Sequence, residues 1–453
     1  MKSLPLLSLA VAVSGLLSFP LAADESGNWP HWRGENGNSV SSAATPPTEW
    51  SESRNIKWKT EIPGRGSGSP VIWENQVFVV SAVSAGGSSS EATPSSPEPG
   101  KKGDKGRKGG KGKGGGRGSS GPLSFQLFCY DRETGELIWK QTAVTAAPHE
   151  GTHQTNGYAS ASPCTDGERV YAHFGSRGLY CYDLEGKLLW SKTDFPPMTT
   201  RAGFGEGSSP TLAGGKILVP WDHEGDSALY AIDKLTGETI WKADRDEPTC
   251  WATPLVVEGG GKTQVVMNGQ NFARAYDLET GEELWRCGGQ TDRPVASAVT
   301  AGELVFIGSG FRGSFLGAFH LDGSGDIEGS KSVAWTTADD TPDIASPLLS
   351  DGRLYFHKGK TGILTCLEAE SGNVLFGPER IPGVSSTYAS PIAAGGFVYL
   401  TGRSGTITVI KDSPSLEIVA TNSLGEGVDA TPAPAGKALF VRGERHLFCI
   451  AEQ

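Results

Sequence analysis

The fold of this chain is decided by a stretch of eleven residues, CYDRETGELIW, at positions 129–139. Close copies stand at 181–190 (CYDLEGKLLW), 231–241 (AIDKLTGETIW) and 275–285 (AYDLETGEELW). The Asp side chain can satisfy backbone donors and the Gly can adopt a positive φ, a combination that is typical of tight turns between antiparallel strands. The Trp that ends each copy offers a large apolar face to a neighbouring unit.

A longer unit of about 41–51 residues surrounds each copy, as in repeat architectures. Each unit begins with a Ser/Thr-Pro pair, passes through an apolar strand and a Gly-rich turn, and ends in the Asp, Thr-Gly and Trp pattern. One further unit begins with Ser297-Ala298, and the later copies diverge: His320 replaces the Asp, a Gly/Asp-rich insertion delays Trp335, and Phe376 replaces the Trp. The seven intact starts are Ser69-Pro70, Ser162-Pro163, Ser209-Pro210, Thr253-Pro254, Ser346-Pro347, Ser390-Pro391 and Thr431-Pro432.

These units predict an all-β fold, an eight-bladed β-propeller made of four-stranded antiparallel blades. The eighth unit lacks its last strand, and residues 55–59, just before the first unit, can supply it. Trp58 has the spacing of the other tryptophans but no unit of its own. We therefore expect an N-terminal strand to close the ring and remove its exposed edges. A seven-bladed ring with spare strands is the alternative.

One aromatic side chain per unit is expected to pack between neighbouring blades. Each such burial stabilises the fold by about 2–3 kcal/mol. The predicted docking residues are Trp58, Trp139, Trp190, Trp241, Trp285, Trp335 and Phe376.

The seven cysteines follow the same repeat. Four of them occupy a slot that holds Ala in other units, which indicates a small buried position on an inner strand. Equivalent slots in different blades lie too far apart to be bridged, so we expect no structural disulfide. Their spacing does not fit a zinc site either. The four are Cys129, Cys181, Cys366 and Cys449.

The chain is expected to consist of a signal peptide at 1–23, an N-terminal arm at 24–54 and the propeller at 55–453. Lys2, a short apolar run and the small residues before Asp24 are typical of a secretory signal, with an uncleaved anchor as the alternative. The segment from Trp29 to Gly34 is expected to pack against the propeller rim, and a ligand site there is the minor alternative. The protein should therefore be exported, to the periplasm or the extracellular space.

Residues 84–122 interrupt the first blade. This segment is Ser/Pro-rich at first and Lys/Gly-rich later, a composition that cannot bury a core and predicts disorder. Three interpretations fit this composition: a solvated loop, a segment that folds back onto the acidic surface of the chain, and a tether to an anionic polymer, lipid or nucleic acid.

The overall composition excludes some classes of protein. The formal net charge is −11, which does not favour binding to nucleic acid. Beyond the N-terminus, the sequence contains no segment apolar enough to cross a membrane. We expect a monomer.

The repeat resembles the tryptophan-docking motif of the pyrroloquinoline quinone (PQQ)-like propeller superfamily, and the resemblance covers about residues 50–453. With the segment from Trp29 to Gly34, the whole chain looks like the exported PQQ-binding-like propellers of planctomycete-type bacteria. The superfamily includes PQQ-dependent alcohol dehydrogenases and the non-catalytic outer-membrane assembly scaffold BamB. The dehydrogenases cover their cofactor with two adjacent cysteines, and no two cysteines are adjacent here. BamB is anchored through an N-terminal Cys that this sequence lacks.

Candidate ligand-binding residues lie in the loops that precede each Ser/Thr-Pro, because these loops crowd one face of a propeller near its axis. No nucleophile, base and acid can be assembled from them. His149 and His153 lie in a Pro/Gly/Thr loop, which lacks the helical geometry of a metal-binding pair, so no catalytic or metal-binding residue is predicted. The candidates are His149, His153, Tyr158, Arg201, Glu206, Trp251, Arg293, Asp343, Tyr388 and Asp429.

The sequence thus favours an exported, non-catalytic propeller that binds a protein or a polymer in the cell envelope, as BamB does. No cofactor is expected in this case. The alternative is a PQQ-dependent quinoprotein dehydrogenase, for which the resemblance implies PQQ and Ca²⁺.

Overall fold

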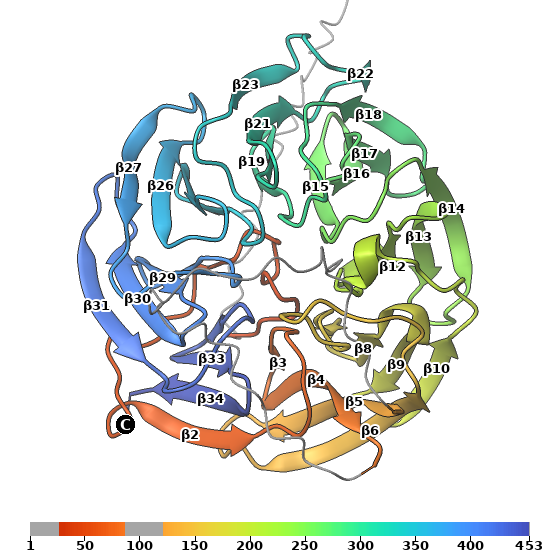
Figure 1. Cartoon of the computed structure of the whole chain (residues 1–453), viewed down its shortest axis with the longest axis vertical. Helices are drawn as coiled ribbons and strands as arrows, with labels where there is room; N and C mark the ends of the chain where they lie inside the picture. The colour runs from red at the N-terminus through yellow and green to blue at the C-terminus, as the bar shows by residue number, and fades with distance from the viewer. Residues whose placement is uncertain (1–26, 87–120, 453) are drawn as a thin grey trace, which may run out of the picture.

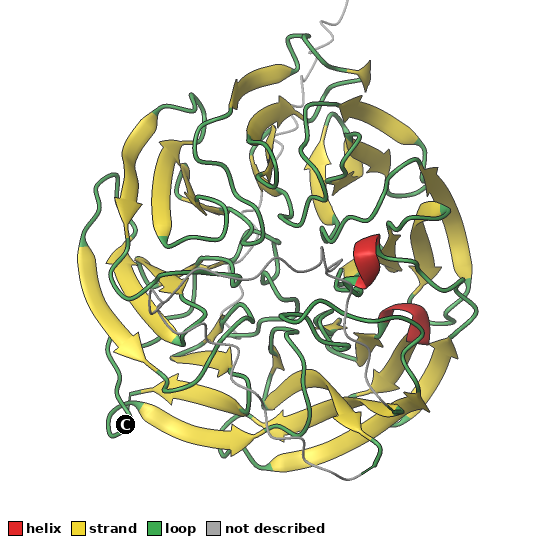
Figure 2. Ribbon diagram, in the orientation of Figure 1, coloured by secondary structure: helices red, strands yellow, loops and turns green. Residues whose placement is uncertain are grey.

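The computed structural model describes residues 27–86 and 121–452. These residues form a ring of eight β-sheets around a central axis (Figure 1), with two short 3-10 helices as the only helical segments among them (Figure 2). The predicted signal peptide at 1–23 and most of the predicted insertion lie outside the described residues. Ser84, placed in the insertion by the sequence, is the last residue of a strand.

Each of the first four blades has four antiparallel strands in sequence order from the axis outward. They comprise β3 (Val71–Trp73), β4 (Gln76–Ser84), β5 (Leu123–Asp131) and β6 (Leu137–Ala146); β7 (Cys164–Thr165), β8 (Arg169–His173), β9 (Leu179–Asp183) and β10 (Leu188–Lys192); β11 (Thr211–Ala213), β12 (Lys216–Trp221), β13 (Ser227–Asp233) and β14 (Thr239–Arg245); and β15 (Leu255–Gly259), β16 (Lys262–Met267), β17 (Ala273–Asp277) and β18 (Glu283–Cys287).

The last four blades repeat this order. They comprise β19 (Val299–Ala301), β20 (Leu304–Ser309), β21 (Phe315–His320) and β23 (Val333–Thr337); β24 (Leu348–Ser350), β25 (Arg353–His357), β26 (Ile363–Glu368) and β27 (Val374–Arg380); β28 (Ile392–Ala394), β29 (Phe397–Thr401), β30 (Thr406–Lys411) and β31 (Ile418–Ser423); and β32 (Ala433–Ala435), β33 (Ala438–Arg442) and β34 (His446–Ala451) with β2 (Ile56–Glu61).

The ring closes through its N-terminal strand, as predicted. In blade 8, β2 pairs antiparallel with β34, and Trp58 lies opposite Cys449. Figure 1 shows the red-orange β2 beside the blue β34. The prediction of eight blades is confirmed, and the alternative of seven blades with spare strands is wrong.

Each turn glycine of the repeat lies under the tryptophan of the preceding blade. Gly135 has a φ of +73°, and a Cβ there would lie 2.6 Å from Cδ2 of Trp58. The indole Nε1 of Trp58 donates to the Arg132 carbonyl over 2.9 Å. Equivalent hydrogen bonds of 2.9 to 3.1 Å run from Trp139 to Leu184, from Trp190 to Lys234, from Trp241 to Leu278 and from Trp335 to Ala369.

Two of the predicted docking residues behave differently. Nε1 of Trp285 donates to Gln264 within its own blade, because the next blade lacks the Asp and Thr-Gly turn that would present a carbonyl. Phe376, which has no donor, packs against the ring of Tyr355 with 6.1 Å between the centroids.

All seven cysteines are buried and unpaired. Cys129, Cys181, Cys366 and Cys449 lie on the third strand of their blades and not on an inner strand as expected, because the turn that follows them joins the third strand to the fourth.

A closed ring of hydroxyl groups links the blades where their innermost strands begin. The backbone N–H of Ser69 donates to Oγ of Ser162, the next start along the ring, over 2.9 Å. The pattern repeats at every start, and Ser297 keeps its hydroxyl although no Pro follows it. The remaining bonds run from Ser162 to Ser209, Ser209 to Thr253, Thr253 to Ser297, Ser297 to Ser346, Ser346 to Ser390, Ser390 to Thr431 and Thr431 to Ser69.

The segment from Trp29 to Gly34, predicted to pack against the rim, lies inside the ring together with the following residues up to Thr45, whereas Thr48 and Trp50 reach the outermost strand β31, at Asn422. The backbone of Trp29 exchanges two hydrogen bonds with Ile72 of β3, and the side chain of Asn38 exchanges two with Thr300 of β19. β1 (Val40–Ser41) pairs in parallel with β28. The arm can make these contacts because the innermost strands leave one edge free toward the axis.

Further contacts of the arm complete the circuit of the eight blades. They join Pro30 to Thr165, His31 to Pro210, Gly37 to Leu255, Arg33 to Pro347 and Thr45 to Gly436. The arm therefore occupies the channel beyond the hydroxyl ring.

Blade 4 carries a fifth strand at its outer edge. β22 (Gly325–Asp326), which lies in the Gly/Asp-rich insertion of the next unit, pairs in parallel with β18. Among the described residues, no helix is long and apolar enough to cross a membrane.

Candidate functional site

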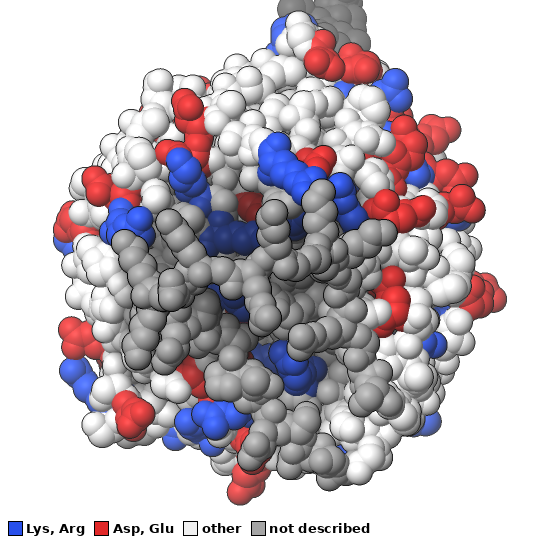
Figure 3. Space-filling model, in the orientation of Figure 1, with Lys and Arg blue, Asp and Glu red and all other residues white. Residues whose placement is uncertain are grey.

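The face of the ring opposite the arm carries two sets of loops. The innermost strands run away from this face, so both the loops that enter each blade and the loops that join its second and third strands open onto it. Because the arm occupies the other end of the channel, these loops surround a funnel that is closed at its base. Figure 3 shows Lys and Arg side chains around the hollow at the centre of this face.

Cations outnumber carboxylates at the wall of the funnel formed by blades 5 and 6. Asp343 lies 3.8 Å from Nη2 of Arg293 and 3.6 Å from Nζ of Lys360, so two cations share one buried carboxylate. Asp292 is shared in the same way by Arg201 and Arg312, each at 3.6 Å.

Aromatic rings support these cations. The guanidinium of Arg293 lies 3.4 Å above the centroid of the Phe311 ring, which Arg312 and Lys360 also approach. Such contacts stabilise a cation by about 0.5–2 kcal/mol without neutralising its charge. The positive charge therefore remains available to an anion.

Blade 7 adds another cation at the funnel. Arg403 makes a bidentate ion pair with Asp429, at 2.6 and 3.0 Å, and its guanidinium lies 4.0 Å above the ring of Tyr388. The hydroxyl groups of Tyr388 and Thr155 lie 3.3 Å apart, although they come from the entry loops of blades 7 and 2. The entry loop of blade 2 therefore reaches across the funnel.

The positive field shifts ionisation equilibria at the funnel. Burial lowers the pKa of Arg293, Asp343 opposes this shift, and the nearby Arg201 and Arg312 lower the pKa further. The pKa of His153 is lowered first by burial and then by Lys360, Arg293 and Arg403. An anion in the funnel would relieve this repulsion.

The backbone is strained at the same place. Arg293 has a φ of +46°, Arg312 of +55°, Asp340 of +50° and Ala202 of +55°, all in loops of this face. A non-glycine residue in this region costs on the order of 1–3 kcal/mol, and such residues concentrate at ligand sites.

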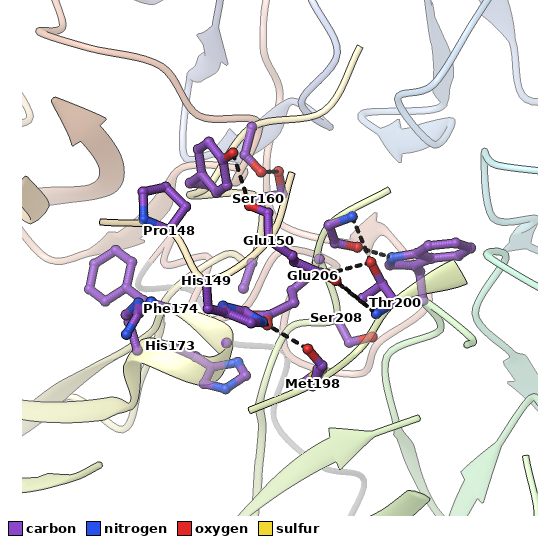
Figure 4. Close-up of a pocket in the computed structure, with 18 of the residues that line it drawn as sticks. Pro148, His149, Glu150, Ser160, His173, Phe174, Met198, Thr200, Glu206 and Ser208 are labelled. Carbon is purple, nitrogen blue, oxygen red and sulfur yellow. Dashed lines mark hydrogen bonds and ion pairs between the residues drawn. The ribbon is translucent and has the colours of Figure 1, made fainter. Parts of the chain in front are cut away.

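The structure divides the ten predicted site residues into two groups. His153, Arg201, Arg293, Asp343, Tyr388 and Asp429 lie around the funnel. His149, Tyr158, Glu206 and Trp251 line a separate small cavity beside blades 2 and 3 (Figure 4).

Four residues of the funnel were not predicted from the sequence: Phe311, Arg312, Lys360 and Arg403. All four lie in loops between the second and third strands of their blades. The order of the strands could have identified them, because in an up-and-down sheet the loops between the second and third strands open onto the same face as the entry loops.

Comparison with known proteins places the chain among PQQ-like propellers. A family model described as outer membrane protein assembly factor BamB matches residues 101–221 and 126–377. A search of the curated proteins finds no match for this chain.

Solved structures with TM-scores above 0.5 share the fold at low sequence identity. Quinohemoprotein alcohol dehydrogenase from Comamonas testosteroni is 10% identical with a TM-score of 0.60, covering 95% of this chain and 82% of its own. The computationally designed Ika8 protein is 12% identical with a TM-score of 0.53, covering 75% and 98%. BamB from Moraxella catarrhalis is 13% identical with a TM-score of 0.38, covering 73% and 82%.

Proposed function

Because this chain belongs to the family described as outer membrane protein assembly factor BamB, we propose that it is an exported, non-catalytic scaffold of the cell envelope. Its partner in this proposal is a protein that inserts an acidic segment into the funnel. The observation that carries the proposal is the sharing of Asp343 by Arg293 and Lys360 in a funnel closed by the arm.

Three features of the funnel support an anionic partner. Its cations exceed the carboxylates that contact them, they lie on aromatic rings that leave their charge unneutralised, and strained loops hold two of them in place. On a chain with a net charge of −11, such a local excess of positive charge steers an acidic partner to one face.

The N-terminal sequence and the blade contacts support the rest of the proposal. Residues 1–23 have the pattern of a secretory signal, which would deliver the protein to the periplasm or beyond. The bonds from Trp58, Trp139, Trp190 and Trp241 to the next blade support the assignment of a tryptophan-docking repeat.

The test measures binding of a fluorescently labelled octaglutamate peptide to the full chain by anisotropy. We expect saturable binding that weakens as salt rises from about 50 to 300 mM, because salt screens the charges. Arg293→Gln and Lys360→Gln should each weaken binding about fivefold or more. Lys242→Gln, on the outer strand of blade 3, removes the same charge far from the funnel and should change nothing.

Equal affinities for the funnel variants and for Lys242→Gln would overturn the proposed site. An anionic polysaccharide such as polygalacturonate, added as competitor, tests an envelope polymer as the partner. If it binds tightly through Arg293 and Lys360 while octaglutamate does not, the partner is a polymer and the protein partner is wrong.

A PQQ-dependent dehydrogenase is the second candidate, favoured by the cationic and aromatic lining of the funnel, which suits a planar polycarboxylate. The residues fit the cofactor only in part. The adjacent cysteines that the resemblance requires have no counterpart, because the seven cysteines are separate, buried and unpaired. Titration of the purified chain with PQQ and Ca²⁺, followed by fluorescence quenching, decides between the two, and binding at micromolar PQQ would favour this candidate.

A further inference from the structure

A second site lies beside the funnel, in the small cavity of Figure 4. The cavity has a volume of about 40 Å³, enough for an ion with its water, and opens among the loops of blades 2 and 3. The entry loop of blade 2 contributes His149 and Glu150, and the entry loop of blade 3 contributes Glu206.

Three potential ligands converge there. One ligand atom each of His149, Glu150 and Glu206 lie within 4.8 Å of one another. Nε2 of His149 lies 3.4 Å from Oε1 of Glu206 and donates a hydrogen bond to the Met198 carbonyl over 2.8 Å, so a bound metal ion would replace its proton. Two ligands of one ion with bonds of about 2.1 Å lie about 3.0–3.4 Å apart, so the separation of His149 from Glu206 already fits a shared ion.

A further histidine lines the same cavity, although it lies outside the group of three ligands. His173, at the end of β8, is 2% exposed and lines the same cavity, and neither of its ring nitrogens makes a hydrogen bond among the described residues. A buried imidazole without a partner of good hydrogen-bond geometry is destabilising, and a bound metal ion or its water would supply one.

The surrounding backbone holds both carboxylates in place. Glu206 accepts from the N–H and the hydroxyl of Ser176, at 2.7 and 2.5 Å, and Glu150 accepts from the N–H and the hydroxyl of Thr200. Gly175, with a φ of +55°, makes room for Glu206, because a Cβ there would lie 1.4 Å from Oε2. Each carboxylate keeps further lone pairs for a cation.

We propose that His149, Glu150 and Glu206, with His173 beside them, bind a divalent transition-metal ion of the zinc class. Imidazole and carboxylate ligands together suit Zn²⁺ or Co²⁺, whereas Ca²⁺ selects oxygen ligands alone. His149 and Glu206 were predicted as ligand-binding residues, but a metal site was not, because its ligands come from two separate loops. His153 does not belong to the group of three ligands.

The test adds Co²⁺ to the full chain, purified without a histidine tag and treated with chelator. We expect one equivalent of Co²⁺ to produce visible d–d absorption bands, and Zn²⁺ to abolish them by displacement. Isothermal titration with Zn²⁺ measures the affinity. His149→Ala and Glu206→Gln should each weaken binding at least tenfold, by about 1.4 kcal/mol or more.

His446→Ala is the matched control. His446 also pairs with a buried carboxylate, Glu426, at 2.6 Å, but it belongs to no three-ligand group among the described residues. Binding should persist in this variant. Thermal unfolding without metal verifies that His149→Ala and Glu206→Gln are folded. Absence of d–d bands at about 100 µM Co²⁺, or affinity unchanged in both variants, would overturn the proposal.

Discussion

The backbone N–H of Thr431 donates to Oγ of Ser69 over 3.0 Å, although 362 residues separate the two in the chain. This bond is the last of eight that link each blade to the next at the start of its innermost strand. Two sets of contacts therefore close the ring. Near the axis it is the bond between Thr431 and Ser69, and at the outer edge it is the pairing of β2 with β34.

Removal of one hydroxyl from this ring should destabilise the fold. Thr431→Val keeps the shape of the side chain but leaves the buried N–H of Ser390 without its acceptor. We expect a loss of about 1–3 kcal/mol in the free energy of unfolding, measured by urea denaturation. Thr145→Val, at an exposed position of β6, is the control and should cost less than about 0.5 kcal/mol.

Substitution of two glycines of blade 3 by Ala distinguishes the cost of backbone strain from the cost of lost packing. Gly237 and Gly215 have φ values of +76° and +80°, but only Gly237 lies against a tryptophan, with Trp190 Cε3 2.6 Å from a Cβ placed there. Gly215→Ala should cost on the order of 1 kcal/mol from strain alone. Gly237→Ala should cost clearly more, since it also displaces Trp190; equal losses would show that this contact contributes little.

Acid should weaken the fold through its buried histidines. Burial lowers the pKa of His31, His173 and His357 each to about 4. The unfolded chain takes up these protons near pH 6.5, so the stability they contribute is complete above pH 6.5 and is lost as the pH falls toward 4. His357→Leu should reduce the pH slope of the unfolding free energy by up to about 1.4 kcal/mol per pH unit. A slope unchanged from that of the parent protein would contradict this.

A fully buried ion pair should respond differently to single and double replacement. Arg245 and Asp222 are 0% and 1% exposed and are joined by two hydrogen bonds, of 2.7 and 3.0 Å. Asp222→Asn leaves the guanidinium charge buried without a counter-ion and should cost about 3–5 kcal/mol. Combining Asp222→Leu with Arg245→Met should recover much of that loss. Urea denaturation of the three proteins checks the order.

The exposed pair of Lys411 and Glu417 is the control for that experiment. Its side chains are 53% and 48% exposed. Lys411→Gln should change the free energy of unfolding by less than about 1 kcal/mol, because solvent screens the pair.

The sequence by itself determined the blades. The Asp of each turn accepts backbone bonds, as Asp131 does from Glu133 and Thr134, and the Gly takes a positive φ, so the pattern encodes its own local structure. The seven Ser/Thr-Pro pairs and Ser297-Ala298, one at the start of each unit, predict eight blades. Trp58, which belongs to no unit, indicates how the ring closes. These features are local or periodic, and a single sequence records them.

Only the tertiary structure decided what the loops and the arm do. Lys360 and Arg403, from blades distant in the chain, lower the pKa of His153 after burial does. His149 pairs with Glu206 between two loops, and Arg33 donates to the Pro347 carbonyl inside the channel. The spacing of residues in the sequence does not encode these contacts, because they depend on the rotation between neighbouring blades about the ring axis. The ring geometry thus converts scattered loop residues into a funnel and a cavity.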